Sequence, residues 1–478
     1  MFALRDYQED AINDVRNAFS VHHAVLLVLA TGAGKTVCFT EIASLAAQRN
    51  NRVLVLAHRD TLIKQASGKM DAYGVRPGII MAGFTPDPTA LVQVGSVQTL
   101  VRRLESKFCD MWEPRLIIID EAHLSAAKSY QRILARWPKA KILGVTGSPI
   151  RLDGKPLGKK AGGTFDYMVK GISIGELIER GYLSNPIVYA PREQLDLSGI
   201  RSLGGEYRDD DLEKLVDKPK LIGSAVEYYK KVAMGIPAVA WCVTLNHARH
   251  VRDRFIEAGI PAEMLCGEDS TERREEVLGK LARREILVVT FVGLLVEGVD
   301  VPEIGCVILL RPTKSTSAYL QTVGRGLRVL PGKNTCIILD HASLTYTHGF
   351  VDDERDWVLD YDEDSGPKGK RKTKAKTIAA VHCDTCHAIV APQPVCPVCG
   401  SPLAATGRKI DEVDGELVQL SKEDKKKIQV KRRKEVEQAK TLEDLLMIEN
   451  ARGYSDGWAR HTFNTRLQTR RKYVNGGK

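Results

Sequence analysis

Short runs rich in Val, Ile and Leu alternate along the chain with stretches whose apolar residues recur at helical spacing. Such runs are typical of strands covered on both faces of a parallel sheet. In the first part of the chain we expect strands at Ala24–Leu29, Arg52–Ala57, Leu91–Val94, Leu116–Asp120 and Ile142–Val145. Later strands are expected at Pro186–Tyr189, Ala238–Cys242, Ala262–Leu265, Ile286–Thr290, Cys306–Leu310 and Cys336–Asp340.

The alternation occurs twice, with a break near 180–186, and predicts an α/β protein with two parallel-sheet domains in tandem. A stretch rich in Lys, Gly and Asp with few apolar residues follows and is typical of a linker. The expected order is a first domain, a second domain, a charged linker, a small cysteine unit and a basic helical tail, at 1–185, 186–350, 351–376, 377–405 and 406–478.

The charge of the chain is compatible with a nucleic-acid partner. The formal net charge is +10 over 478 residues, and the excess of Lys and Arg lies mostly after residue 365. The longest apolar runs are far shorter than the roughly 20 residues that cross a bilayer. Because the first ten residues are also polar and acidic, we expect a cytoplasmic protein without membrane contact.

The ten cysteines fall into two groups. Six stand in apolar surroundings and are expected to be free buried thiols: Cys38, Cys109, Cys242, Cys266, Cys306 and Cys336. The other four have the spacing C-x2-C-x9-C-x2-C and predict a closed tetrahedral Zn²⁺ site: Cys383, Cys386, Cys396 and Cys399. With four thiolates the metal has no open position, so its role is structural, and His382 and His387 are interpreted as bystanders.

A strand, a tight glycine turn and an amphipathic helix are expected within "AVLLVLATGAGKTVCFTEIASLAA". Gly32 and Gly34 would let the turn point its N–H groups at phosphate oxygens, at the start of the helix. Lys35 would neutralise the β- and γ-phosphates, and the Thr36 hydroxyl would hold Mg²⁺. A chance Gly-Lys-Thr is the alternative, and the flanking strand and helix argue against it.

Two adjacent carboxylates end a later apolar run, in "RLIIIDEAH". Asp120 would bind Mg²⁺ directly or through water, and Glu121 would activate the attacking water as a general base. An ordinary acidic strand end is the alternative.

The combination of "ATGAGKT" and "DEAH" resembles the superfamily 2 helicases and translocases, whose phosphate loop is written A-x-x-G-x-G-K-T. Further motifs resemble that family in order and extend the resemblance over residues 1–345: "LRDYQ", "LAHRDTLIKQ", "VGSVQTL", "GVTGSP", "VAWCVTLNHA", "VVTFVGLLVEGVDVP" and "YLQTVGRGLR". The fourth motif reads Thr-Gly-Ser where many relatives have Thr-Ala-Thr.

The resemblance implies two RecA-like domains that close on ATP and Mg²⁺ and hydrolyse the ATP. It implies nucleotide contacts by Gln8, which would read adenine, by Asp300 near the ribose, and by Thr31, Gly32, Ala33, Gly34, Lys35, Thr36, Arg325 and Arg328. The residues it implies in catalysis are Lys35, Asp120, Glu121, Arg325 and Arg328. The two arginines would reach the γ-phosphate from the second domain, although in isolation such residues could form surface ion pairs.

Contacts to a nucleic-acid backbone are expected from hydroxyls, amides and scattered basic groups. By motif position the candidates are Arg59, Ser96, Gln98, Thr244 and Thr290. The basic loop 151–160 could add phosphate contacts or be an ordinary solvated charge run.

The tail reads as two helices around "GYSDGWA". Tyr454, Trp458 and Phe463 could stack on bases beside arginines, but a small hydrophobic core under the turn is favoured. A helicase core, a four-Cys unit and this tail together resemble the bacterial RadD (YejH) group of DNA-repair helicases and phage relatives. That resemblance implies single-stranded or branched DNA as substrate and single-strand-binding protein as a candidate partner.

Three functions stay open at this point. The first is an ATP-driven DNA helicase in repair, recombination or replication. The second is a translocase that moves on duplex DNA without separating strands, and the third is a nucleotide-switched accessory protein that binds a repair partner.

Overall fold

The structure is a computed structural model of the chain. It describes residues 4–57, 67–68, 70–71, 74–151, 154–191, 194–203, 206–293, 301–360, 381–382, 389–390, 417–419, 422–452, 454 and 457–475. The chain forms two compact units, one of 1–362 with 415–478 and a smaller one of 363–414. In the smaller unit the described residues are an antiparallel pair, β16 (Val381–His382) and β17 (Ile389–Val390). The four predicted zinc ligands lie outside the described residues.

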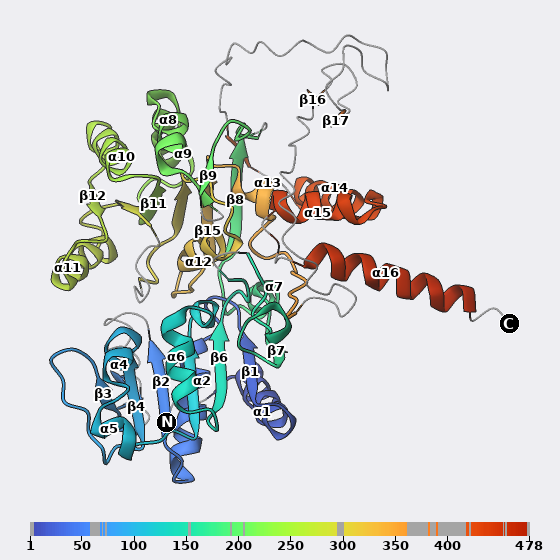
Figure 1. The fold of residues 1–478 in the computed structure, drawn as a ribbon. Coiled ribbons are helices and arrows are strands. Elements are labelled where there is room, and N and C mark those ends of the chain that lie inside the picture. The colour runs from blue at the N-terminus through green and yellow to red at the C-terminus, as the bar shows by residue number, and fades with distance from the viewer. Residues whose placement is uncertain are drawn as a thin grey trace. The chain divides into compact units, whose positions relative to one another are not determined.

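The first sheet of the larger unit is parallel throughout and has the strand order β3-β4-β2-β5-β6-β1-β7 (Figure 1). Its strands are β1 (Ala24–Val28), β2 (Val53–Ala57), β3 (Gly78–Ile80), β4 (Val92–Ser96), β5 (Leu116–Asp120), β6 (Lys141–Thr146) and β7 (Tyr167–Lys170). The five strands expected from the apolar runs are confirmed, and their ends differ from the expected ones by at most two residues. The strands β3 and β7 were not expected, because they are only three and four residues long.

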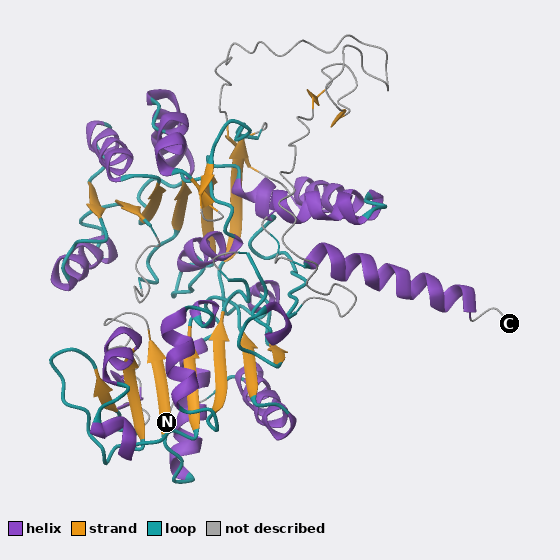
Figure 2. Cartoon of the chain, in the orientation of Figure 1, coloured by secondary structure: helices purple, strands orange, loops and turns teal. Residues whose placement is uncertain are grey.

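Helices cover both faces of this sheet (Figure 2). They are α1 (Asp6–Val21), α2 (Lys35–Gln48), α4 (Val97–Arg103), α5 (Lys107–Met111), α6 (Lys128–Arg136) and α7 (Ile174–Glu179), with short 3-10 turns at Ala122–Leu124 and Lys159–Ala161. Alternate residues of β1 enter different cores: Val25 and Leu27 pack with α1 and α2, whereas Leu26 packs with Trp112 and Tyr130. This two-sided burial explains why the central strands are continuous apolar runs.

The second sheet has the order β12-β13-β11-β14-β15-β8-β18. Its strands are β8 (Asn185–Pro191), β11 (Ala238–Cys242), β12 (Ala262–Leu265), β13 (Val288–Val292), β14 (Cys306–Leu309), β15 (Thr335–Asp340) and β18 (Leu417–Gln419). The six expected strands are confirmed as a parallel set. The seventh, β18, comes from the C-terminal part of the chain and pairs antiparallel with β8.

A short hairpin, the helices of the second sheet and the C-terminal helices complete the larger unit. The hairpin consists of β9 (Ser202–Leu203) and β10 (Glu206–Tyr207). The helices are α8 (Asp209–Val216), α9 (Pro219–Val232), α10 (Leu245–Glu257), α11 (Thr271–Ala282), α12 (Thr316–Gly326), α13 (Leu344–His348), α14 (Lys422–Gln438), α15 (Leu442–Arg452) and α16 (Trp458–Asn475). Among the described residues, no helix has the length and apolarity that a membrane span requires.

The burial of side chains bears on two expectations about the C-terminal half, the start of the linker and the packing of the tail. Residues 351–360 were expected to begin a charged linker, yet Val351 is fully buried and Val358 is 7% exposed, so this stretch packs with the domain. In the tail, Trp458 packs with Leu445 and Ala459 in a small core, which supports the core interpretation over exposed stacking. Of the six scattered cysteines, five are buried and Cys266 is half-buried.

Candidate functional site

The glycine turn after β1 has the shape that the sequence predicts. Gly32 has φ 90° and Gly34, the N-cap of α2, has φ 85°, in the left-handed region that favours glycine. A Cβ at Gly32 would lie 2.7 Å from Leu183, and one at Gly34 would lie 2.5 Å from Gln8 Nε2. The turn therefore requires glycine twice, and it leads into a 14-residue helix whose first N–H groups are available to an anion.

Gln8 contacts the backbone of this turn. Its Nε2 donates to the carbonyl oxygen of Ala33 (3.0 Å), and its Oε1 accepts from the Arg5 backbone N–H (3.0 Å). The Tyr7 hydroxyl donates to the same Ala33 carbonyl at 3.2 Å. Gln8 is 5% exposed, so in this structure it supports the turn, and its reading of adenine stays a prediction.

Lys35 and Glu121 face each other between α2 and the end of β5. Lys35 Nζ lies 3.9 Å from Glu121 Oε1, and His123 Nδ1 lies 3.3 Å from Glu121 Oε2. Glu121 has φ 48°, an uncommon backbone conformation for a residue with a side chain, and its N–H donates to Asp120 Oδ1 at 3.0 Å. Strain of this kind clusters at functional sites, where the surrounding structure maintains it.

The charge on Glu121 is set by groups from both sheets. Burial raises the pKa of its carboxyl, but Lys35, His123 and Arg325 outweigh burial and lower the pKa to about 2. Glu121 is therefore an ionised acceptor at neutral pH. Arg325 lies on α12, in the domain of the second sheet. Its charge nevertheless lowers the pKa of Glu121, so the structure places Arg325 near the Lys35–Glu121 pair of the first domain.

The helix α12 approaches the phosphate turn closely. A Cβ at Gly324 would lie 2.6 Å from Thr31 Cγ2, and one at Gly147 would lie 3.1 Å from Lys35 Nζ and 3.2 Å from Thr31 Oγ1. At the other end of the helix, the Ser148 hydroxyl donates to the Ser317 hydroxyl. Two glycines thus leave room for the turn, the lysine and α12 to meet.

Arg328 lies just beyond α12, and its backbone contacts the segment that leads from α7 into β8. It forms an isolated antiparallel bridge with Leu183. Its carbonyl oxygen accepts from Ser184 Oγ at 3.3 Å and from Lys333 Nζ at 2.6 Å. The contact of its guanidinium with a γ-phosphate stays a prediction.

The residues around the turn fit MgATP. Thr36 is the second residue of α2 and Asp120 is the last residue of β5, and a hydroxyl with a carboxylate is a donor set that suits Mg²⁺. Leu183 and Gln8 take the space that a Cβ at Gly32 or Gly34 would need, so glycine at both positions keeps the shape of the turn. The predicted roles of Thr36 and Asp120 as Mg²⁺ ligands remain predictions.

The candidate nucleic-acid residues differ in accessibility. Gln98 on α4 is exposed, whereas Ser96 is only 2% exposed. Thr244 caps α10 by accepting from the His247 N–H (3.2 Å), and it donates to Glu213 Oε1 (2.6 Å). Thr290 is fully buried and donates to the Ala248 carbonyl (3.0 Å). The hydroxyl of Thr290 is thus bonded within its domain, and its contact with a nucleic-acid strand stays a prediction.

Two further predicted residues, Arg59 and Asp300, lie outside the described residues. Conversely, sequence reasoning missed Leu183, His123 and Ser317 as parts of the site. The only signal for His123 was its place in "DEAH", and Leu183 and Ser317 carried none.

Two family models match the chain. The model described as "Type III restriction enzyme, res subunit" matches residues 1–151, and "Helicase conserved C-terminal domain" matches residues 225–329. A 51.5 kDa protein of a Lactococcus phage is 31% identical over 370 residues, which are 77% of this chain and 76% of that protein. The chain belongs to the superfamily 2 helicases. Members of this family are ATP hydrolases, and the site described above is where this helicase would hold ATP.

Two longer relatives match the same part of this helicase. IRC3 of Saccharomyces cerevisiae, named as a candidate ATP-dependent helicase, is 30% identical over 70% of this chain and 51% of its own length. The EcoAI endonuclease subunit, a type I restriction enzyme of Escherichia coli, is 26% identical over 76% of this chain and 49% of its own length. The chain therefore spans about half the length of these two relatives.

Solved structures share the fold. A fragment of a candidate HsdR subunit of a type I restriction enzyme from Vibrio vulnificus has a TM-score of 0.56 at 23% identity, over 72% of this chain and 65% of that chain. The ATP-dependent type ISP restriction–modification enzyme LlaBIII bound to DNA has a TM-score of 0.50 at 20% identity, over 70% of this chain and 27% of that chain. Together with the two sheets, these likenesses show a tandem of RecA-like domains.

Proposed function

We propose that this helicase is a DNA-dependent ATPase whose two RecA-like domains close on ATP and thereby move along a DNA strand. The observation that carries the proposal is the meeting of the two domains at the phosphate turn. Lys35 Nζ lies 3.9 Å from Glu121 Oε1, and α12, the helix that carries Arg325, packs closely against Thr31 of the turn. A carboxylate and two cations converge there, beside a turn built for phosphate.

The groups of the chain suit phosphoryl transfer. Mg²⁺, when bound with ATP, would neutralise charge on the phosphates. Lys35 and the N–H groups of the glycine turn bind and orient the phosphates, and Glu121 accepts the proton of the attacking water. Arg325 stabilises the charge that develops on the transferred group, an effect worth roughly 10³–10⁵ in rate in related NTPases.

Movement would follow from the same geometry. Because the nucleotide is held from both sheets, its hydrolysis weakens the contact between the domains and lets each domain grip the strand in turn. Gln98 is an exposed candidate for that grip, and Thr244 is a half-buried one. DNA as the polymer is supported by the net charge of +10 and by relatives named as restriction enzymes.

A second candidate is a translocase that moves on duplex DNA without separating its strands. The matches to restriction enzymes favour this translocase, because the names of those relatives do not include a helicase activity. The narrower roles in repair, recombination or replication, on branched DNA and with single-strand-binding protein, rest on the resemblance of the tail and the cysteine unit to the RadD group.

The test compares ATP hydrolysis in the presence of single-stranded DNA, duplex DNA and RNA, together with strand-displacement and triplex-displacement assays. If the protein is a helicase, single-stranded DNA is expected to stimulate its ATP hydrolysis, and the protein is expected to displace one strand of a duplex. Stimulation by duplex with triplex displacement alone would favour the second candidate. Hydrolysis that no nucleic acid stimulates would favour the nucleotide-switched accessory protein and overturn the proposal.

Arginine variants locate the active groups. Arg325→Ala is expected to lower kcat by at least about 10³-fold, in line with arginine fingers of related NTPases. Arg283→Ala is the matched control, since the Arg283 side chain is 61% exposed and pairs with Glu285 away from the nucleotide turn. Equal activity of the two variants would overturn the assignment of Arg325.

The proposal includes a structural Zn²⁺ held by Cys383, Cys386, Cys396 and Cys399. Their spacing supports it, since two C-x2-C pairs are typical of a tetrahedral thiolate site. This unit could contact nucleic acid or protein.

A further inference from the structure

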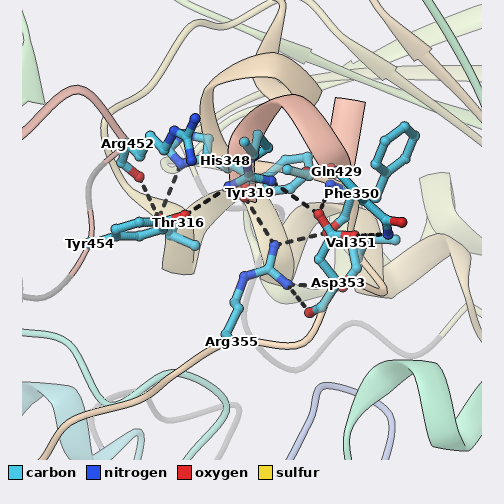
Figure 3. Close-up of polar contacts among 12 residues, drawn as sticks. Thr316, Tyr319, His348, Phe350, Val351, Asp353, Arg355, Gln429, Arg452 and Tyr454 are labelled. Atoms are coloured by element: carbon cyan, nitrogen blue, oxygen red, sulfur yellow. Dashed lines mark hydrogen bonds and ion pairs between the residues drawn. The ribbon is translucent and has the colours of Figure 1, made fainter. Parts of the chain in front are cut away.

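The C-terminal end of α12 carries Arg325. Its N-terminal end lies against the C-terminal helices, where Thr316 contacts Arg452 (Figure 3). Thr316, the first residue of α12, is 4% exposed. Its Oγ1 lies 3.0 Å from His348 Nδ1 and 3.4 Å from the carbonyl oxygen of Arg452 at the end of α15. One residue further along, Ser317 contacts Ser148 of the first sheet.

His348 connects this end of α12 to its surroundings as a neutral ring. Its Nε2 lies 2.9 Å from the Thr313 carbonyl oxygen, so Nε2 carries the proton and Nδ1 accepts from Thr316. Burial lowers the pKa of His348 to about 4. Tyr319, one turn into α12, stacks on the ring with centroids 5.5 Å apart and donates its hydroxyl to the Gly349 carbonyl at 3.1 Å.

The turn that follows His348 is organised by Arg355. This guanidinium donates to the carbonyl oxygens of Asp353 (2.8 Å) and Phe350 (3.0 Å), and to those of Val351 and His348 (both 3.3 Å) (Figure 3). Burial lowers the pKa of Arg355 from its usual value. Four carbonyl acceptors on one half-buried guanidinium tie the turn together, and α12 packs against this turn through Tyr319.

Arg432 of α14 joins the C-terminal helices to this turn. Its NH1 donates to Asp353 Oδ2 at 3.0 Å, and its NH2 donates to the Tyr454 hydroxyl at 3.0 Å. Both side chains of the Arg432–Asp353 pair are largely buried, with 14% and 13% exposed. The guanidinium also fills the space beside Gly349 that a Cβ would occupy. Gln429, one turn earlier on α14, donates to Asp353 Oδ1 at 2.8 Å.

We propose that Arg432 is a positioning residue for Arg325. It acts through Asp353 and the turn 348–355, which hold the N-terminal end of α12. The inference rests on the proposed role of Arg325 and extends it, because it assigns part of the catalytic geometry to helices that neither helicase family model covers. The C-terminal helices can serve as a fixed support because they have their own core around Leu445 and Trp458.

The physical reason is the precision that charge stabilisation requires. A displacement of about 1 Å at a reacting group can cost about 100-fold in rate. Arg325 stands nine residues after Thr316 on one helix, so a tilt of α12 at its first turn moves the guanidinium. Arg432 makes one bond to a carboxylate, that of Asp353, and one to a hydroxyl, that of Tyr454. Because the guanidinium holds both bonds in a fixed geometry, it resists such a tilt better than the flexible side chain of a lysine would.

The experiment measures kcat and KM for ATP with saturating single-stranded DNA, and the affinity for a fluorescent ADP analogue. Arg432→Ala is expected to lower kcat by about 10- to 100-fold with a change in KM below about twofold. A lysine at this position can bond Asp353 but cannot bond Tyr454 at the same time. The kcat of Arg432→Lys is therefore expected to lie between that of the parent and that of Arg432→Ala. Arg433→Ala is the matched control on the same helix, since Arg433 is 83% exposed and pairs with Glu437, and it is expected to match the parent.

A double variant separates positioning from general loss of structure. If Arg432 acts through Arg325, Arg432→Ala is expected to cause no further loss of kcat in the Arg325→Ala background, measured in single-turnover reactions. If Arg432→Ala lowers kcat in the Arg325→Ala background by as much as it does in the parent, the inference is overturned. It is also overturned if Arg432→Ala or Arg432→Lys folds and has the kcat of the parent. Thermal unfolding identifies variants that fail to fold, and Arg432→Lys keeps the test open in that case. Full activity of Arg325→Ala alone would instead overturn the proposed function.

Discussion

The hydroxyl oxygens of Ser148 and Ser317 lie 2.6 Å apart, one from each RecA-like domain. Ser148 follows β6 in a turn that is itself closed: its N–H lies 3.3 Å from Thr146 Oγ1, which in turn donates to the Ser148 carbonyl at 3.0 Å. Ser317 stands at the start of α12, the helix that carries Arg325. This bond therefore connects the Thr-Gly-Ser motif of the first domain directly to the helix that carries part of the proposed ATP site.

Removing either hydroxyl should weaken domain closure. One neutral hydrogen bond contributes about 0.5–1.5 kcal/mol, so Ser148→Ala and Ser317→Ala are each expected to lower the DNA-stimulated ATPase rate by about 2- to 10-fold. The double variant should lose no more than one single variant, which a double-mutant cycle measures. Ser20→Ala is the control, because Ser20 makes an equally short bond to the Asn17 carbonyl at an exposed position of α1. Additive losses would show that the two hydroxyls act separately.

Lys35→Ala should abolish turnover without unfolding the protein. The lysine faces Glu121 at 3.9 Å beside the glycine turn, so its loss removes charge that would neutralise phosphate. We expect ATP hydrolysis to fall by at least about 100-fold, with an unchanged far-UV circular dichroism spectrum. Arg49→Ala, at the exposed opposite end of α2, is expected to keep full activity. Substantial DNA-stimulated hydrolysis by Lys35→Ala would count against the site.

The buried His348 should make stability depend on pH. Its folded pKa of about 4 is below the ordinary value of 6.5, so both states are neutral above pH 6.5. As pH falls from 6.5 towards 4, the unfolded chain takes up a proton that the folded protein does not, and stability is lost at about 1.4 kcal/mol per pH unit. Between pH 7 and pH 5, the free energy of unfolding in urea should fall by about 2 kcal/mol more in the parent than in His348→Gln, in which the buried His247 and His341 still contribute. An identical pH dependence in both proteins would contradict the prediction.

Zinc content tests the cysteine unit. Cys396→Ser removes one of four predicted thiolates, and we expect purified protein to lose most of the one equivalent of Zn²⁺ that the parent would carry. Basal ATP hydrolysis should persist, because the nucleotide site lies within a different compact unit. Cys266→Ser is the matched control, since Cys266 is half-buried in the larger unit. Equal metal content in Cys396→Ser and parent would overturn the ligand set.

Several features were predictable because they are local. The central strands were recognisable from apolar runs that two-sided burial requires, as in "LLVL" and "LIIID". Others depended on distant partners. The strand β18 has three residues and exists by pairing with β8, and the side chain of Thr290 is engaged because α10 passes over it. The linker was expected to begin at residue 351, whereas the partly buried guanidinium of Arg355 binds the carbonyl groups of that stretch.

The sequence by itself determined the phosphate turn and the pair Asp120–Glu121, because a glycine turn before a helix and two carboxylates at a strand end are consequences of short-range backbone geometry. Only the tertiary structure decided that Arg325 acts on Glu121 and that Arg432 supports the helix that carries Arg325. Those relationships join residues about 200 and 80 positions apart, and they exist because the packing of two sheets and three C-terminal helices brings charges together that no local pattern encodes.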